Sequence, residues 1–380
     1  MRVLAVTTWF PTPSHPSVGA FVVKDAHAVA GLGHDMHVVH LVPPHQWGHG
    51  LPEDAVVGGL PVTRVRMSTA HPGQIAAAGV RLRAMAGHTD LVHTMAFSSL
   101  LPMAWWRPAA PWVHTEHWSG LTAPQTLPAS WRLALPALRR LLGRPDVVTA
   151  VCDYLARPVR EVREAGEAGD RGGQPTVVVP CIVPVPDPVP PRPAPADRLR
   201  LVGIGGLIER KDPVMAVDTV AELRRRGQDA ELVLVGEGPL RDTVVARADA
   251  LGLADRVRLT GPLDRDGVLQ ALADADLFLG PTRGDNFFVS CAEAVVAGRP
   301  VVVGATGGQG EYIDPRVGRT VDDQSAAAYA AAVQDVLARA EGLTAQQISD
   351  TVGQRFSVDA VAAGYQAAYD LAVAVRGGRT

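Results

Sequence analysis

Short runs of β-branched and aliphatic residues alternate with amphipathic segments along this 380-residue chain, and this alternation restricts its fold more than any other feature. Each run has the length of a buried strand, and each intervening segment is long enough for a helix. In the first half the expected strands are Val3–Thr7, Met36–Leu41, Val62–Arg66, Leu91–His93, Trp112–Thr115, Val147–Ala150 and Thr176–Val179, and the expected helices include Phe21–Leu32, Ile75–Ala86 and Ala129–Leu142. Alternating strands and helices predict an α/β fold with a parallel sheet covered on both faces.

The alternation stops at a proline-dense segment, residues 183–197, and then starts again. The second half is expected to form strands Leu199–Ile204, Glu231–Val235, Val257–Thr260, Leu277–Gly280 and Pro300–Val303, with helices Pro213–Arg226, Pro239–Leu251, Asp264–Ala273, Ala292–Ala297, Ala326–Ala340 and Val358–Val375. Proline-dense segments act as stiff spacers. We therefore predict two doubly wound Rossmann-like domains, residues 1–182 and 199–355, with a linker at 183–198 and a C-terminal helix within 356–380 that packs back on the first domain.

Composition excludes several classes of protein. The three cysteines lie far apart without a CxxC pair, which argues against a disulfide framework and a zinc finger. The formal net charge of −3 argues against a nucleic-acid-binding protein. The N-terminus lacks the apolar stretch of a signal peptide, and no window reaches the roughly 18 apolar residues of a membrane span. We expect a cytoplasmic protein.

Three successive expected strands in the second half end in glycine turns. A glycine turn that opens a helix presents backbone N–H groups and the positive end of a helix dipole to an anion, although ordinary turns share this composition. Lys211, one of only two lysines in the chain, follows the first turn beside Arg210 and offers a compact positive charge for a diphosphate. The predicted donor-binding residues of these turns are Gly206, Arg210, Lys211, Gly236, Gly261 and Leu263.

The segment from Gly284 to Gly298 carries the strongest functional signal. Its carboxylates, Asp285 and Glu293, lie eight residues apart across an expected helix start and suit a ligand rich in hydroxyl groups. The N–H groups at the helix start would be free for a phosphate. The alternative is a capped helix with a buried glutamate. The predicted site residues here are Asp285, Asn286, Phe287, Phe288, Val289 and Glu293.

Ionisable residues also gather at the expected strand ends of the first half. His93 ends one strand, and the sequence His-Thr-Glu-His-Trp ends another at residues 114–118. This spacing differs from the HExxH zinc motif, so we predict no metal site. The predicted residues are Gly19 for the donor, His117 for catalysis, and Lys24, Asp25, His93, Glu116 and Trp118 for the acceptor.

Together these segments resemble the retaining GT-B glycosyltransferases of family 4, with matches spread from Val3 to beyond Phe356. Residues 281–301, PTRGDNFFVSCAEAVVAGRPV, resemble the family motif P-S-x-x-E-x-F-x-x-x-x-x-E-A-x-A-x-G-x-P-V. The less specific matches are GGLIERK at 205–211, LVGEGP at 234–239, GGQGE at 307–311, Thr115-Glu116-His117 and Ser17-Val18-Gly19.

The resemblance implies an acceptor-binding first domain and a donor-binding second domain that face each other across a cleft. Glu293 would hold the ribose hydroxyls of a nucleotide sugar, and Asp285 the sugar hydroxyls. Lys211 would hold the diphosphate, and His117 would contact the transferred sugar. The reaction would move a hexosyl unit to a hydroxyl acceptor with retention of configuration, without a metal or other cofactor. A UDP-sugar is favoured as the donor, and a GDP-sugar is next.

Three positions depart from the family pattern. Gly206 stands where the family has arginine, which removes a positive charge that Arg210 or Arg283 would have to supply. Asp285 replaces a glutamate and is one methylene shorter, so the sugar would sit closer or a water would bridge. Cys181-Ile182 stands where a Pro-Asn-Gly hinge is common.

Two questions stay open at the level of sequence. The chain could be a nucleotide-sugar epimerase or a non-catalytic carbohydrate-binding module of the same fold. The acceptor could be a small molecule or lipid-linked. Trp105-Trp106-Arg107 and Trp131-Arg132 with Arg139-Arg140 would suit contact with a membrane surface, or ordinary helix packing.

Overall fold

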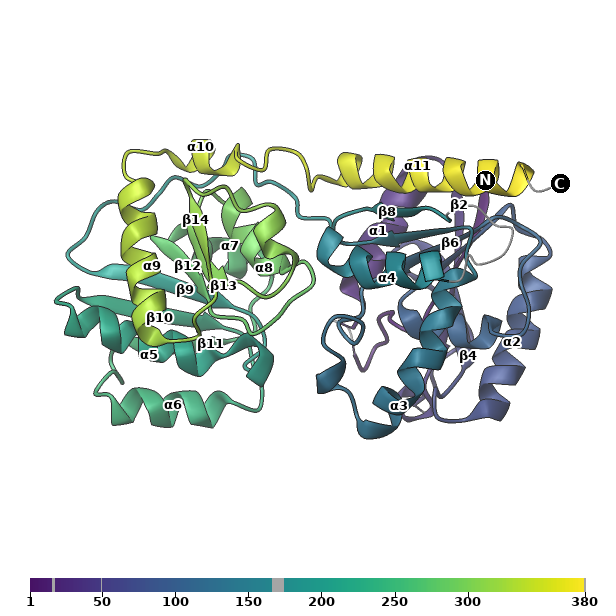
Figure 1. The fold of residues 1–380 in the computed structure, drawn as a ribbon, viewed down its shortest axis with the longest axis horizontal. Helices are drawn as coiled ribbons and strands as arrows, with labels where there is room; N and C mark the ends of the chain where they lie inside the picture. Colours follow the sequence, from purple (N-terminus) through teal and green to yellow (C-terminus); the bar gives the residue numbers. More distant parts are fainter. Residues whose placement is uncertain (16–17, 49, 166–173, 379–380) are drawn as a thin grey trace. The chain divides into compact units, whose positions relative to one another are not determined.

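The computed structural model describes residues 1–15, 18–48, 50–165 and 174–378. The chain divides into two compact units, Met1–Ile182 with Val358–Thr380, and Val183–Ser357. Each unit is built on one β-sheet flanked by helices (Figure 1). None of the helices in these residues is both long and apolar enough to cross a bilayer.

The first unit contains a mostly parallel sheet. In the described part of the chain its strands run in the order β3-β4-β2-β1-β5-β6-β7-β8, with only β3 antiparallel to its neighbour. The bounds are β1 Arg2–Thr7, β2 Asp35–Val42, β3 Asp54–Val57, β4 Leu60–Arg66, β5 Leu91–Met95, β6 Trp112–Glu116, β7 Val147–Ala150 and β8 Thr176–Val178. The strand order reverses between β1 and β5, and sheets of this kind bind ligands at the carboxyl ends of the strands around such a point.

The helices expected in this unit are present, one of them in changed form, and α4 is an additional helix. Their bounds are α1 Ala20–Gly31, α2 Pro72–Ala86, α3 Ala129–Leu138, α4 Asp153–Ala165 and α11 Val358–Gly377, with short 3-10 turns η1 Pro44–Gln46, η2 Phe97–Met103, η3 Pro124–Thr126 and η4 Arg139–Gly143. The α-helix expected at 129–142 ends at Leu138 and continues as η4, since Pro136 in its last turn cannot donate a backbone hydrogen bond. Ser17 of the expected glycine loop lies outside the described residues.

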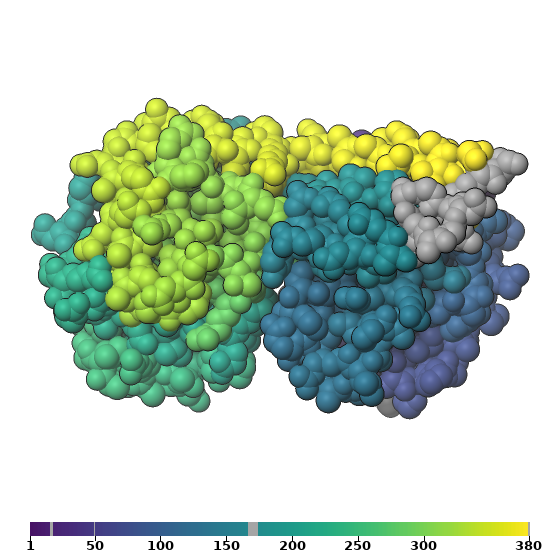
Figure 2. All heavy atoms as spheres, viewed as in Figure 1, coloured from purple at the N-terminus to yellow at the C-terminus, as the bar shows by residue number. Residues whose placement is uncertain are grey.

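Helices α1 and α11 share one core with the sheet. Val22 and Val29 of α1 and Tyr365 and Tyr369 of α11 are fully buried in the cluster that also contains strand residues of β1 and β2. Figures 1 and 2 show α11 lying along the first unit, against segments that are far from it in sequence. The last helix of the chain therefore completes the core of the first unit.

The second unit contains a parallel sheet. Its described strands run in the order β11-β10-β9-β12-β13-β14. The strand bounds are β9 Leu199–Ile204, β10 Ala230–Val235, β11 Val257–Gly261, β12 Leu277–Gly280, β13 Val301–Gly304 and β14 Gly318–Val321. The helix bounds are α5 Pro213–Arg225, α6 Arg241–Ala250, α7 Arg265–Ala273, α8 Val289–Val296, α9 Ala326–Arg339 and α10 Ala345–Ser349, with η5 Glu209–Lys211 and η6 Gly308–Glu311. The strand order reverses between β9 and β12, which marks the expected ligand position of this unit.

Hydrogen bonds attach part of the proline-dense segment to the second unit. Arg192 donates to the carbonyl oxygens of Ala340 and Leu343, and the buried Arg299 donates to those of Pro190 and Pro191. These bonds fix the segment to helices of the unit that follows it. Residues 190–192 of the predicted linker are therefore held against the second unit by the hydrogen bonds of Arg192 and Arg299.

Candidate functional site

A narrow pocket lies at the reversal point of the second sheet. It has a volume of about 30 Å³, and the side chains of Lys211 and Phe288 help to line it. The other lining residues come from the ends of β9 and β12 with the turns after them, from the start of α5 and from β10: Gly203, Ile204, Gly205, Gly206, Leu207, Pro213, Ala216, Leu234, Leu279, Gly280 and Pro281. The sequence-predicted residues Gly206, Lys211 and Phe288 are thus brought together here.

The glycine turns pack directly against one another. Gly236, at φ 137°, donates its N–H to the carbonyl of Gly261, and a Cβ on Gly236 would lie 2.0 Å from the carbonyl oxygen of Gly205. Only glycine allows this backbone approach and this φ. Gly236 and Gly261 therefore shape the site, while Leu263 is 39% exposed just beyond it.

Two cations converge on one carboxylate at this site. Lys211 Nζ donates to Asp285 Oδ2, and Arg210 Nη1 lies 2.7 Å from the same oxygen. Lys211 also lies over the Phe288 ring, 3.8 Å from its centroid. Burial lowers the pKa of Lys211, while Asp285 opposes this shift. These three residues, predicted from two separate segments, thus form one charged cluster.

Arg283 lies outside this cluster. Its guanidinium pairs with Asp212 at 2.7 Å, and Asp212 also caps α5 by accepting from the Met215 N–H, as expected. Of the two arginines that the sequence offered in place of Gly206, only Arg210 contacts Asp285.

Helix α8 begins at the pocket with unpaired backbone donors. Phe288 precedes the helix at φ 56°, and Tyr312 Oη donates to the carbonyl oxygens of Phe287 and Phe288. The N–H groups of Phe287, Phe288 and Val289 donate to no carbonyl among the described residues. Because the helix dipole adds positive potential there, this end of α8 suits an anion.

The other predicted residues of this segment differ in exposure. Asn286 is 6% exposed, whereas Glu293 on the second turn of α8 is partly exposed. The Gly308 N–H donates to the carbonyls of Asp285 and Asn286, so the glycine-rich loop at 305–311 supports the segment through its backbone.

In the first unit, His117 follows β6 and faces α1. Its Nε2 lies 3.7 Å from Asp25 Oδ2, and its ring centroid lies 4.6 Å from that of Phe21. Glu116, fully buried, accepts from the N–H groups of His117 and Trp118 through Oε1 and fixes the turn. Burial, with a smaller effect of His114, lowers the pKa of His117 to about 3. The imidazole is therefore neutral at physiological pH.

Three residues that the sequence assigned to the acceptor are buried and form hydrogen bonds with other residues of this chain. Asp25 accepts from Tyr365 Oη at 3.0 Å. His93 bonds Tyr369 Oη and Thr115 Oγ1 at 2.8 and 2.6 Å. With Glu116 they hold α1, β5, β6 and α11 together, so we no longer propose acceptor contacts for them. The exposed Lys24, the partly exposed Trp118 and the closely packed Gly19 keep their proposed roles.

The Asp25 carboxyl makes folding stability depend on pH. Burial raises its pKa from 3.8 to about 7. Between these values the unfolded chain has lost the proton that the folded chain keeps, so the contribution of Asp25 to stability is present at low pH and is lost as the pH rises toward 7. We expect Asp25→Asn to be more stable than wild type at about pH 8, by on the order of a few kcal/mol, with the advantage shrinking toward about pH 4.

Thermal unfolding across this pH range checks the expectation. Asp359→Asn, which changes an exposed aspartate on α11, is the matched control and should show no such trend. A constant difference between Asp25→Asn and wild type at every pH would contradict the raised pKa.

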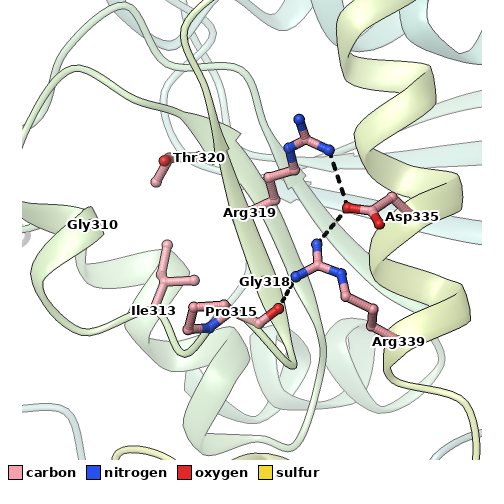
Figure 3. Close-up of a pocket in the computed structure, with 8 residues that line it drawn as sticks. All are labelled: Gly310, Ile313, Pro315, Gly318, Arg319, Thr320, Asp335 and Arg339. Atoms are coloured by element: carbon pink, nitrogen blue, oxygen red, sulfur yellow. Dashed lines mark hydrogen bonds and ion pairs between the residues drawn. The ribbon is translucent and has the colours of Figure 1, made fainter.

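A second hollow, of about 580 Å³, lies between β14 and α9 (Figure 3). Arg319 and Arg339 both reach Asp335 there, and Arg339 also donates to the carbonyl of Pro315. Because both guanidinium groups are engaged, we assign this hollow no part in the site. Within the described residues no group of three or more His, Cys, Asp or Glu side chains is placed to hold a metal ion.

Comparison with known proteins gives matches over both units. Residues 198–339 match the family described as Glycosyl transferases group 1, and residues 18–168 match Glycosyltransferase Family 4. A Mycobacterium tuberculosis protein named GDP-mannose-dependent alpha-(1-6)-phosphatidylinositol monomannoside mannosyltransferase is 28% identical over 360 residues, 88% of this chain and 89% of that protein. Its Mycolicibacterium smegmatis namesake is 30% identical over 280 residues, 68% and 70%. Sucrose-phosphate synthase from Thermosynechococcus elongatus shares the fold, with a TM-score of 0.75 at 20% identity over 98% of this chain and 100% of that one.

Proposed function

Because this chain belongs to the group 1, family 4 glycosyltransferases, enzymes that use a nucleotide-sugar donor, we propose that it transfers mannose from GDP-mannose to a hydroxyl group of a phosphate-containing acceptor. The sequence favoured a UDP-sugar. The names of the two mycobacterial relatives favour GDP-mannose and an acceptor of the phosphatidylinositol mannoside class instead. We propose retention of configuration, as the resemblance implied.

The single observation that carries the proposal is the cluster of Lys211, Arg210 and Asp285. A donor diphosphate would compete with the carboxylate for the two cations, and Asp285 would then accept hydrogen bonds from sugar hydroxyls. The free N–H groups at the start of α8 would bind diphosphate oxygens, and Glu293 would hold the ribose. As the bond to the sugar breaks, the same donors would stabilise the charge that develops on the leaving diphosphate.

Arg210 would supply the charge that Gly206 lacks. We expect Arg210→Ala to raise the donor KM about 10-fold or more, as loss of a charge-assisted hydrogen bond does. A Cβ at Gly206 would meet only ordinary contacts, with the Glu237 oxygen at 3.7 Å, so Gly206→Arg is sterically acceptable. Adding Gly206→Arg to Arg210→Ala should lower the donor KM again.

Steady-state kinetics of wild type, Arg210→Ala and the double variant with Gly206→Arg checks whether one arginine can replace the other. Arg283→Ala is the matched control, because Arg283 pairs with Asp212 and should leave the donor KM within about twofold of wild type. A double variant no better than Arg210→Ala would show that Arg210 acts in some other way.

His117 would act as a neutral hydrogen-bonding group toward the transferred sugar. A protonated imidazole would repel the positive charge that develops on the sugar ring at the transition state. The lowered pKa keeps it uncharged. Trp118, which packs against Phe97 and Trp131, and Lys24 would contribute to acceptor binding.

The test is a transfer assay with GDP-mannose, UDP-glucose and UDP-N-acetylglucosamine, with phosphatidylinositol mannoside and free inositol as acceptors. We expect mannosylated lipid from GDP-mannose alone, and NMR of the product should show a retained anomer. An isomerised nucleotide sugar formed without an acceptor would instead identify an epimerase. Absence of any thermal shift with every nucleotide sugar would overturn the donor assignment.

A further inference from the structure

Two basic side chains lie buried next to each other at the carboxyl ends of β2 and β4. His40 and Arg64 are register partners in this parallel strand pair. They are 0% and 2% exposed, and the Phe10 ring centroid lies 6.0 Å from that of His40. Neither residue belongs to the sites described above.

Arg64 lacks the partners that the other buried arginines have. Arg163 and Arg299, 3% and 0% exposed, each donate to five backbone carbonyls. Arg64 donates through Nη1 to the Pro52 carbonyl, its Nε has no partner, and no ion pair of the described residues includes it. A buried charge is costly unless it is paired or fully hydrogen-bonded, so Arg64 is a cation that lacks its anion.

His40 is equally short of partners. Neither of its ring nitrogens makes a hydrogen bond of normal geometry within the described structure. Burial and then the charge of Arg64 lower the pKa of His40 to about 4, with the Thr8 backbone opposing them weakly. Most buried polar side-chain atoms in folded proteins have a hydrogen-bond partner, so a buried histidine without one on either ring nitrogen is unusual. An anion between the two residues would provide partners for both.

We propose that His40 and Arg64 form a binding site for the oxyanion of a phosphate ester. A guanidinium binds phosphate oxygens in a bidentate manner, and a neighbouring imidazole adds another donor. The site lies at the carboxyl ends of parallel strands, where ligands bind in sheets of this kind. Arg64 donates to the Pro52 carbonyl, so a bound anion would compete with that carbonyl for the guanidinium. Only the identity of the ester, a phosphate of the acceptor, rests on the proposed function.

Thermal unfolding in inorganic phosphate tests the site directly. A ligand that binds only the folded state raises the unfolding temperature with its concentration. We expect phosphate to raise the Tm of wild type by several degrees above that in chloride of equal ionic strength. Arg64→Met should abolish most of this rise, yet its Tm without phosphate should equal or exceed that of wild type, because methionine removes an unpaired buried charge.

Controls separate the site from general electrostatics and from the donor site. Arg66→Met removes an exposed arginine two residues along β4 and should keep the phosphate response. Lys211→Ala removes a cation of the proposed donor site, which would also bind phosphate, and so measures that contribution separately. The part of the rise that depends on Arg64 should remain in Lys211→Ala. His40→Leu should weaken the response and decides the matter if Arg64→Met does not fold.

Two further ligands distinguish the source of the phosphate. Glycerol 3-phosphate offers a soluble ester, and phosphatidylcholine vesicles containing phosphatidylglycerol offer a lipid one, measured by Tm and by cosedimentation respectively. A response to either that Arg64→Met removes and Arg66→Met keeps supports the site and identifies its source. If Arg64→Met and His40→Leu respond to phosphate as wild type does, or if wild type does not respond, the proposal is wrong.

Discussion

Lys211→Ala is expected to lower kcat/KM by roughly 10²- to 10³-fold, the usual cost of removing one donor that meets developing charge. Lys211 is buried against Asp285 and the Phe288 ring, so water cannot replace its charge easily. Its lowered pKa adds a pH dependence. As the pH rises through that lowered value, the free enzyme loses the charge that a diphosphate needs, and the donor KM should increase.

Steady-state kinetics over a series of pH values measures both effects. Arg225→Ala, which removes an exposed cation on α5, is the control and should match wild type. Near-normal kcat/KM in Lys211→Ala would remove the cluster from the mechanism.

His117→Ala is expected to lower kcat by about 10²- to 10³-fold while the dissociation constant of the donor nucleotide stays close to that of wild type. The reason is that, apart from Gly19, the proposed donor contacts lie in the second unit, whereas His117 belongs to the first. An interaction made only in the transition state lowers kcat and kcat/KM together. The neutral imidazole also predicts no inflection in rate near pH 6.5 from this residue.

Pre-steady-state turnover and nucleotide binding by calorimetry separate these quantities. His114→Ala is not a suitable control, because His114 bonds the buried Glu116 that fixes the turn. His88→Ala, which changes an exposed histidine after α2, is the better control and should match wild type. Unchanged kcat in His117→Ala would refute the proposed role.

Regular periodicity made most of the fold predictable from the sequence. Every expected strand is present, because buried parallel strands are continuous apolar runs. The short edge strands β3 and β14 were missed. Asp54–Val57 and Gly318–Val321 are short and partly exposed, so their pattern is weak. Helices α4 and α10 were missed as well: α4 contains Pro158, and α10 has only five residues.

The site was predictable to the extent that its chemistry is local. The segment 284–298 and Lys211 could be selected because their residues are rare or closely spaced. The contact of Lys211 and Arg210 with Asp285 joins residues more than seventy positions apart, and no spacing reveals it. The burial of Asp25 and His93 depends on Tyr365 and Tyr369, at the other end of the chain. His40 and Arg64 can be recognised only in the structure, where both ring nitrogens of His40 and Nε of Arg64 lack hydrogen-bond partners among the described residues.

The position of α11 has a consequence for biosynthesis. Tyr365 and Tyr369 complete the core around α1, yet they are translated after the whole of the second unit. Residues 183–357 form an uninterrupted segment that can acquire its own core earlier. The second unit is therefore expected to fold before the first, whose α1 face stays uncovered until α11 leaves the ribosomal exit tunnel.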